Sequence, residues 1–181
     1  MIVNDQVLLG TVLGGSSLVK PPKGINYYLS MRSQNEKWLC YKMQEMQQFY
    51  KNTKPHWYTN TYRCTSCCSE KLTELHKTMY NEDKRKITME IIDPIRDIGL
   101  AVWFLDSGSK TGRGRKNAYI NTTKFGEEGT KIVKQYFDEV GMPCNINKDG
   151  TRLKVLFTIE GTKELFKVIE PCVPMFMLHR I

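Results

Sequence analysis

The sequence predicts an α+β fold made of two similar halves, and three observations support this class. The expected helices and strands follow one order twice: helix, two strands, helix, one or two strands, helix. The two opening helices end at Gly15 and Ser107, which are 92 positions apart (107 − 15), about half of the 181 residues. The composition, 40% apolar and 25% charged, is that of an ordinary globular chain. A repeat of this length indicates a duplicated unit rather than a solenoid.

In the first half, apolar residues at helical spacing are interleaved with aromatic and β-branched runs. Asn4 or Asp5 is a candidate N-cap for the first helix, which a pair of glycines would end. The expected elements are a helix over 4–14, a hairpin across 18–33, a helix over 35–50, a strand over 56–64 and a helix over 69–80.

A basic stretch follows, and the second half then repeats the order. An Asp-Gly pair marks the turn between its last two strands. The expected elements are a helix over 94–106, a basic hairpin over 110–125, a helix over 126–140, two strands within 142–159 and a helix over 161–170.

The charge balance favours a polyanionic partner. The chain holds 27 Lys and Arg against 19 Asp and Glu, a formal net charge of +8. A signal peptide requires a basic residue before its apolar stretch, and none precedes the first apolar stretch here. No apolar run approaches the ~20 residues of a membrane span. We therefore expect an intracellular protein with no membrane partner. Bacterial or phage cytoplasm and organelles all remain open as its compartment.

The cysteines carry only a weak metal signal. Cys64 and Cys67 have the spacing of half a zinc site, with Cys68 beside them. No second pair follows, so small residues at a strand-to-helix junction and reduced thiols are the favoured interpretation. Whether these three cysteines bind anything stays open.

Two segments carry the functional inference: L-L-G-T-V-L-G-G-S-S-L over 8–18 and L-A-V-W-F-L-D-S-G-S over 100–109. They resemble the paired motifs of the LAGLIDADG homing endonucleases, and the second is similar to the LAxWFMDDGS form of one subgroup. The strings Y-L-S-M-R-S at 28–33, Y-R-C-T-S at 62–66 and I-N-T-T-K-F at 120–125 are similar to subgroup strings in the same order. The resemblance thus extends over nearly the whole chain.

The resemblance implies a monomer of two pseudosymmetric αββαββα halves, over 1–88 and 89–181. Each half would present a saddle-like DNA-binding sheet, and the two motif helices would meet at the interface. Packed helices need small residues where they cross. Gly10 and Gly14, spaced i to i+4, meet that need in the first helix, and Ala101 meets it in the second.

The resemblance also implies an active site, which this sequence lacks in part. In the family each motif helix ends in an acid, and the two acids share divalent metals such as Mg²⁺. The matching positions are Gly15 and Ser107, which offer a backbone carbonyl and a hydroxyl. The metal ligands left are Asp106, one residue earlier and only a weak candidate, and the backbone of Gly15. We expect little or no double-strand cleavage, with weak nicking through Asp106 at most.

The family places a lysine beside each acidic site. The matching positions here are Lys86, in the stretch K-R-K-I-T, and Arg180, in the terminal L-H-R-I. Arg180 keeps the positive charge but is a poor proton shuttle. Thr123 stands where the subgroup has a glutamine, which is a further departure.

The hairpins of the family lie along the major groove of double-stranded DNA, where alternate side chains meet base edges. The candidate DNA-binding residues are Lys20, Lys23, Asn26, Tyr28, Arg32, Tyr58, Asn60, Tyr62 and Arg63 in the first half, and Lys110, Arg113, Arg115, Lys116, Asn117, Tyr119, Asn121, Lys148, Arg152 and Lys154 in the second. Because the halves differ, a long, weakly palindromic site is expected.

Three classes of function remain open at this stage. The chain is a homing endonuclease that lacks both acids, by decay or by substitution; or it is an endonuclease-derived DNA-binding regulator or an intron RNA maturase; or it is an unrelated basic globular protein. Sequence-specific binding of a duplex would eliminate the third class. Binding of intron RNA as tightly as DNA would favour the maturase.

Overall fold

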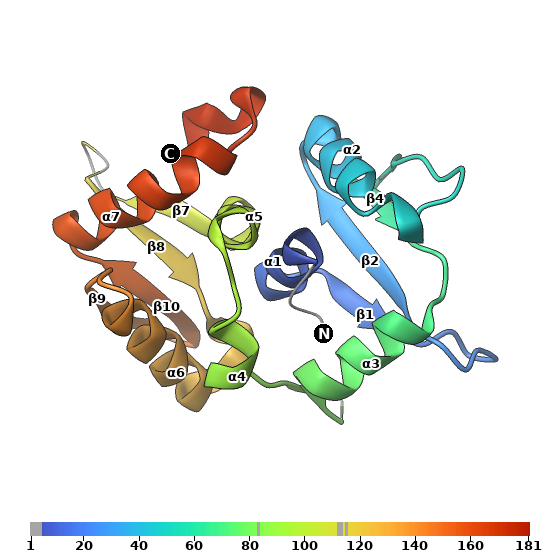
Figure 1. Ribbon diagram of the computed structural model, residues 1–181, viewed down its shortest axis with the longest axis horizontal. Helices are drawn as coiled ribbons and strands as arrows, with labels where there is room; N and C mark the ends of the chain where they lie inside the picture. The colour runs from blue at the N-terminus through green and yellow to red at the C-terminus, as the bar shows by residue number, and fades with distance from the viewer. Residues whose placement is uncertain (1–4, 83, 112–113, 115) are drawn as a thin grey trace.

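The computed structural model describes residues 5–181 except 83, 112, 113 and 115. Two halves lie on either side of a central pair of helices, α1 and α5 (Figure 1). Each half holds one four-stranded sheet, with the order β1-β2-β4-β3 in the first and β7-β8-β10-β9 in the second. The strand order is the same in both halves, and every pairing within them is antiparallel. The predicted α+β fold with a duplicated unit is confirmed.

The first half follows the expected order with two corrections. The helix expected over 35–50 ends at Glu45, and a separate short helix follows it. The strand expected over 56–64 is two strands, because Thr59 and Asn60 take positive φ values of 45° and 62° and form a tight turn. Its elements are α1 (Gln6–Gly14), β1 (Ser17–Val19), β2 (Tyr28–Ser33), α2 (Glu36–Glu45), the short helix η2 (Gln47–Phe49), β3 (His56–Tyr58), β4 (Thr61–Thr65), α3 (Glu70–Met79), β5 (Tyr80–Asn81) and β6 (Lys84–Arg85).

The second half opens with a short helix that the sequence did not indicate, and then repeats the pattern. Its elements are α4 (Met89–Ile92), α5 (Asp97–Ser107), β7 (Gly108–Thr111), β8 (Asn117–Asn121), η3 (Thr123–Phe125), α6 (Gly126–Glu139), β9 (Cys144–Asp149), β10 (Arg152–Phe157), α7 (Ile159–Ile169), η4 (Glu170–Cys172) and η5 (Met175–Arg180). No helix within the described ranges is long and apolar enough to cross a membrane.

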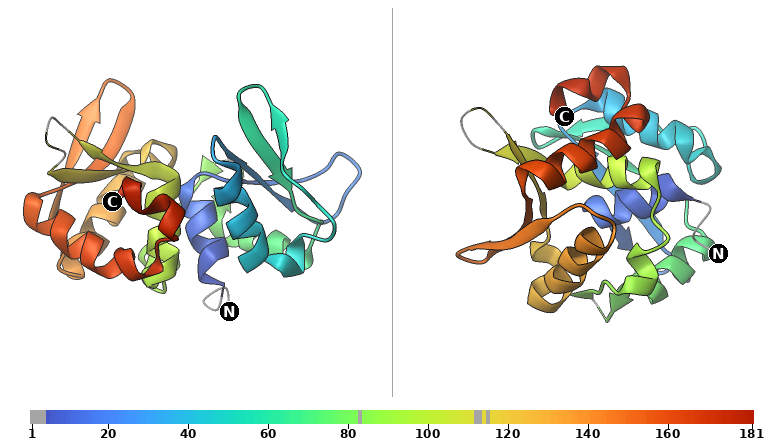
Figure 2. Two further views of the ribbon diagram at one scale, coloured as in Figure 1. Left: turned by 90° about the horizontal axis from the view of Figure 1, so that it is seen from above. Right: turned by 60° about the vertical axis from the view of Figure 1, so that its left-hand side comes forward.

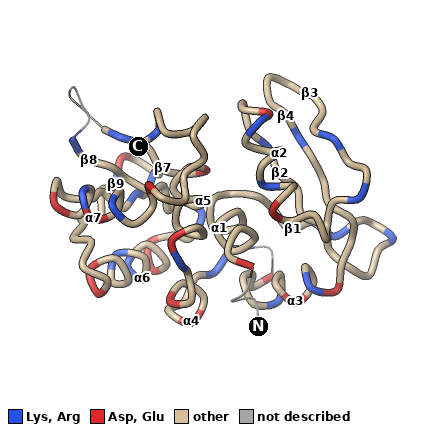
Figure 3. The backbone as a smooth tube through the Cα atoms, turned by 45° about the horizontal axis from the view of Figure 1, so that its top comes forward, with Lys and Arg blue, Asp and Glu red and all other residues tan. Residues whose placement is uncertain are grey.

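Each sheet has one face covered by helices and one open face. Leu29 and Met31 of β2 are buried under the helices, so the side chains that alternate with them, including Arg32, take the open face. The β3–β4 and β9–β10 hairpins, one from each half, extend on the same side of the molecule (Figure 2, left). Acidic residues lie on α4 and α6 (Figure 3), and α6 packs against β9 and β10.

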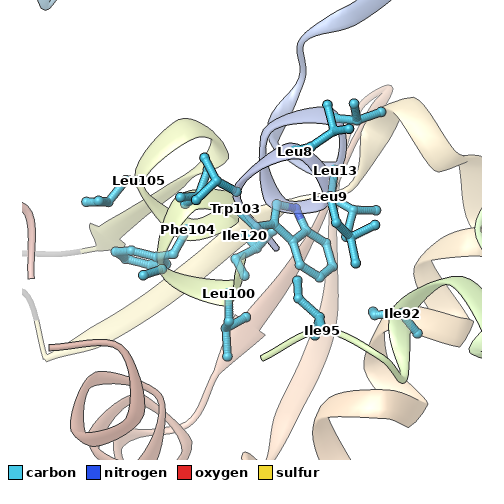
Figure 4. Close-up of a cluster of buried hydrophobic side chains, with 14 of the residues drawn as sticks. Leu8, Leu9, Leu13, Ile92, Ile95, Leu100, Trp103, Phe104, Leu105 and Ile120 are labelled. Atoms are coloured by element: carbon cyan, nitrogen blue, oxygen red, sulfur yellow. The ribbon is translucent and has the colours of Figure 1, made fainter. Parts of the chain in front are cut away.

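The central helices are apolar on all sides because they are buried on all sides. Leu8, Leu9 and Leu13 of α1 lie close to Leu100 and Trp103 of α5 in the core between the halves (Figure 4).

The crossing of these two helices requires glycine. A Cβ atom at Gly10 would lie 2.2 Å from the carbonyl oxygen of Gly99, and one at Gly14 would lie 2.5 Å from the Cβ of Asp106. Ala101 is also fully buried on α5. The expected close approach at Gly10 and Gly14 is therefore confirmed.

Candidate nucleic-acid interface and the ends of the central helices

The open face of the first sheet carries two neighbouring arginines. Arg32 of β2 pairs with Arg63 of β4, so both side chains leave the sheet on the same face. Arg32 is exposed, and the guanidinium carbon of Arg63 lies 4.2 Å from the centre of the Tyr58 ring. Tyr28 lies on this face as well, four residues before Arg32 on the same strand. Like charges directly opposite each other destabilise a sheet, and a bound anion would relieve their repulsion.

The open face of the second sheet combines amides with cations. Asn117, Tyr119 and Asn121 alternate along β8 with the buried residues Ala118 and Ile120. Lys154 of β10 pairs with Asn121, and its Nζ lies 5.0 Å from the centre of the Tyr119 ring. Arg152 also takes this face, opposite Asp149 at the tip of the hairpin. Asparagine, arginine and lysine are the side chains that commonly bond base edges.

Four of the candidate DNA-binding residues lie elsewhere. For the three that are in strands, the reason is that alternation along a strand sends neighbours to opposite faces. Lys110 pairs with the buried Ala118, and its Nζ lies 5.5 Å from the centre of the Phe166 ring on α7. Lys148 bonds Glu127 of α6 through its Nζ at 2.5 Å. Neither lysine therefore lies on the open face of the second sheet, where the other candidates of this half gather.

The other two of the four are Tyr62 and Asn26. Tyr62 packs against the core, with its ring centre 4.8 Å from that of Trp57. The Oδ1 of Asn26 accepts a hydrogen bond of 3.1 Å from the hydroxyl of Thr73 on α3. Both side chains therefore serve the helix-covered side of the first sheet.

The remaining candidates lie in connecting segments. Lys20, Lys23, Asn60 and Lys116 are exposed in loops or turns, and Asn60 also provides the left-handed turn between β3 and β4. Arg113 and Arg115 lie outside the described residues.

The first central helix ends in a conformation that only glycine adopts easily. Gly15 follows the last residue of α1 with φ +131°. The Arg85 guanidinium of β6 closes this end by donating hydrogen bonds to the carbonyl oxygens of Val12 at 2.9 Å, Gly15 at 3.3 Å and Ser16 at 2.5 Å. A cation at this end complements the negative pole of the helix. The Gly15 carbonyl, expected as a metal ligand, is thus engaged by a cation.

The second central helix ends in an equivalent way. Ser107 is the last residue of α5, and its hydroxyl donates to the Trp103 carbonyl oxygen at 3.1 Å. The Arg180 guanidinium donates to the carbonyl oxygen of Gly108 at 3.0 Å. Gly108 follows Ser107 as Ser16 follows Gly15, so Arg85 and Arg180 hold matching places. Arg85, and not its neighbour Lys86, bonds the end of α1, and Lys86 itself is exposed.

Asp106 is committed to an ion pair between the halves. Lys42 of α2 donates to both of its carboxylate oxygens, at 2.9 Å and 2.7 Å, and the Trp38 indole donates to Oδ1 at 2.6 Å. The side chains of Lys42 and Asp106 are 1% and 11% exposed. Because both oxygens already have donors, the expected weak metal role of Asp106 does not fit this arrangement.

Lys124 is a site residue that the sequence analysis did not single out. Its Nζ lies 3.7 Å from the place that a Cβ would take at Gly15. It therefore stands where the side chain of a family acid would begin. The residues are 109 positions apart (124 − 15) and come from different halves. No local pattern places them together, although the string I-N-T-T-K-F already pointed to this segment.

The arrangement does not fit a divalent metal. Mg²⁺ requires several hard oxygen ligands, of which carboxylates are the strongest. Within the described part of the chain, no three His, Cys, Asp or Glu side chains come together as a metal site, the cysteines at 64–68 included. At the end of α1, the Asp106 carboxylate lies beside Gly14 but is bonded to Lys42, and the charged groups at Gly15 are the cations Arg85 and Lys124.

Sequence comparison gives the family to which this fold of two four-stranded sheets around two crossing helices belongs. The chain belongs to the LAGLIDADG DNA endonuclease family, whose model matches residues 5–166. No curated protein sequence matches the chain.

Solved structures agree on the fold. The homing endonuclease I-WcaI bound to its DNA recognition sequence has a TM-score of 0.87 at 15% identity, covering 99% of this chain and 86% of that chain. I-DmoI in complex with DNA and Mn has a TM-score of 0.63 at 14% identity, covering 92% and 96%. The N-terminal LAGLIDADG domain of DUF199/WhiA has a TM-score of 0.59 at 13% identity, covering 98% and 86%.

Proposed function

We propose that this protein binds double-stranded DNA in a sequence-dependent manner and does not cleave it. The observation that carries the proposal is the pairing of Arg32 with Arg63 on an open sheet face, where two like charges lie side by side. A phosphate backbone would neutralise that repulsion, and neutralised phosphates supply most of the affinity of a protein for DNA. The two structures named above that contain DNA, of I-WcaI and of I-DmoI, share this fold.

The loss of cleavage follows from the ends of the central helices. Two-metal hydrolysis needs carboxylates that hold cations near the scissile phosphates. Gly15 and Ser107 carry no carboxylate, and Asp106 is bonded to Lys42 and Trp38. We therefore propose that adding Mg²⁺ produces neither double-strand breaks nor nicks.

We also propose that one chain covers the whole DNA site as a monomer. Both central helices come from the same chain and pack on each other, with halves over 1–88 and 89–181. The two open faces differ, since the first carries two paired arginines, whereas the second carries asparagines beside Arg152 and Lys154. A long, weakly palindromic site follows from this difference.

The test is a selection of bound duplexes from a random pool, followed by cleavage assays with Mg²⁺ and with Mn²⁺. We expect one preferred sequence and intact DNA. Arg32→Gln should weaken binding about tenfold, because it removes one groove contact. The matched control Lys148→Gln removes the same charge from the helix-covered side and should change the affinity less than twofold.

Two results would contradict the proposal. If the pool yields no preferred sequence, the protein does not bind DNA in a sequence-dependent manner. If cleaved product appears, the protein has not lost its catalytic activity. A structured RNA of similar length serves as competitor, because equal affinity for RNA would favour a maturase instead.

A further inference from the structure

The ammonium of Lys124 lies at the end of α1. Among the described residues, the Nζ of Lys124 has neither a hydrogen-bond acceptor nor an ion-pair partner, and it lies 5.2 Å from the centre of the Phe125 ring. The side chain is half-buried and reaches from the second half to Gly15 in the first half. A partly desolvated cation without an anion is costly. An anion bound at this place would remove that cost.

The surroundings of this ammonium are cationic as well. Burial and the nearby Arg85 guanidinium lower the pKa of Lys124 to about 7, and Asp106 opposes them with a smaller effect. The carboxylate of Asp106 is already neutralised by Lys42 at 2.7 Å. A divalent cation would be repelled here, whereas an anion would restore the charge on Lys124.

A cavity of about 420 Å³ opens directly beside Gly15. The residues that line it include the backbone of Gly15, three hydroxyl side chains and the exposed Arg32, and Asp106 contributes the only acid among the lining residues described. The hydroxyls and the Arg32 guanidinium of this lining are donors that bond phosphate oxygens, and the Lys124 ammonium, which lies next to Gly15, is another. The cavity continues onto the open face of the first sheet, because Ser30 and Arg32 of β2 belong to both.

We propose that Lys124, together with Arg32 and the hydroxyls beside Gly15, binds one backbone phosphate of DNA directly, at the place where the resemblance to homing endonucleases implies a metal. This inference rests on the proposed DNA binding and deepens it. It makes the affinity for DNA independent of divalent metals and assigns Lys124 as a phosphate anchor.

The first experiment measures duplex binding by fluorescence anisotropy in excess EDTA and in millimolar Mg²⁺, using a labelled duplex recovered from the selection. We expect the same Kd in both solutions. Lys124→Met should raise the Kd roughly tenfold, the scale of a lost charge-assisted hydrogen bond. The control Lys131→Met removes an equal charge from α6, where the lysine bonds Glu128 on the surface, and should leave the Kd nearly unchanged. Lys124→Gln replaces the methionine variant if that variant fails to fold.

The second experiment locates the phosphate. Single methylphosphonate substitutions, each of which removes one phosphate charge, are placed in turn through the centre of the duplex. At one position, the methylphosphonate should lower the affinity of the native protein for the duplex. The same methylphosphonate should not lower the affinity of Lys124→Met, because that variant already lacks the contact with this phosphate. That coupling would not arise if Lys124 had only a structural role.

The outcomes separate this inference from the proposed function. Failure to bind any duplex would overturn both. Normal binding that requires Mg²⁺, or an equal effect of Lys124→Met and Lys131→Met, would overturn the phosphate anchor alone. Methylphosphonate effects that are the same in both proteins at every position would also overturn it.

Discussion

The ion pair between Lys42 and Asp106 is expected to be the most sensitive electrostatic contact in the fold. Lys42 lies on α2 of the first half, and Asp106 lies on α5 of the second. The Asp106→Asn variant keeps the size of the side chain and removes its charge. It leaves the Lys42 ammonium, whose side chain is 1% exposed, without a counter-charge.

The expected magnitude follows from the geometry. Two unit charges at a separation near that of the Nζ and Oδ2 atoms, 2.7 Å, attract by roughly 6 kcal/mol at an effective dielectric constant of about 20. Desolvation of both groups offsets much of this attraction. Removing one partner of a buried pair costs about 3–5 kcal/mol, because the other charge stays buried. We therefore expect Asp106→Asn to lower the free energy of unfolding by about 3–5 kcal/mol.

A double-mutant cycle gives the pairwise energy. Asp106→Asn, Lys42→Met and the double variant are unfolded in urea and followed by circular dichroism and tryptophan fluorescence. The loss of unfolding free energy in the double variant should be smaller than the sum of the two single losses by about 2 kcal/mol or more, because no charge is left buried. Glu74→Gln is the control, since its ion pair with Lys77 is exposed (67% and 59%) and should change stability by less than about 0.5 kcal/mol.

The reasoning would be refuted by additive single changes, or by a cost of Asp106→Asn no larger than that of Glu74→Gln. Either result would mean that Asp106 is free to take another role, and a metal ligand would be reconsidered for it. A cost within the expected range supports Asp106 as the bond between the halves.

Two further predictions concern the backbone and pH. Gly15→Ala should destabilise the protein by about 1–3 kcal/mol, because Gly15 holds φ +131°. Ser107→Ala, in helical backbone, should change the stability little. Equal effects of the two changes in urea unfolding would contradict this prediction. Burial raises the pKa of Cys64 to about 12, against about 8.5 in the unfolded chain. Above pH ~8.5 only the unfolded state loses this proton, so stability falls with rising pH until about 12. The stability difference between the native protein and Cys64→Ala should shrink by about 1.4 kcal/mol from pH 7.5 to 9.5, and a constant difference would refute the assignment.

Much of the architecture could be predicted from local patterns. Continuous apolar runs ending in small residues marked both central helices, and the i to i+4 glycines marked the place where they cross. The tight turn at Thr59–Asn60 was missed, because an Asn preceded by Thr is a weaker hairpin signal than Asn-Gly.

The strand faces could be predicted only in part. Along β8, buried Ala118 and Ile120 alternate with polar residues, so the open face follows from the pattern. β9 reads C-N-I-N-K-D and is polar on both faces, so nothing in it shows that Lys148 would meet Glu127 of α6. Its direction depends on register with β10.

The sequence by itself determined the duplicated fold, the crossing of the helices and the absence of both acids, because each depends on local composition and on spacing along the chain. Only the tertiary structure decided where the remaining charges act. Asp106 bonds Lys42, 64 positions away in the chain. Arg85 rather than Lys86 bonds the end of α1, and Lys124 lies beside Gly15. Such pairings join segments far apart in the chain, and their energies depend on burial and distance, which local patterns do not encode.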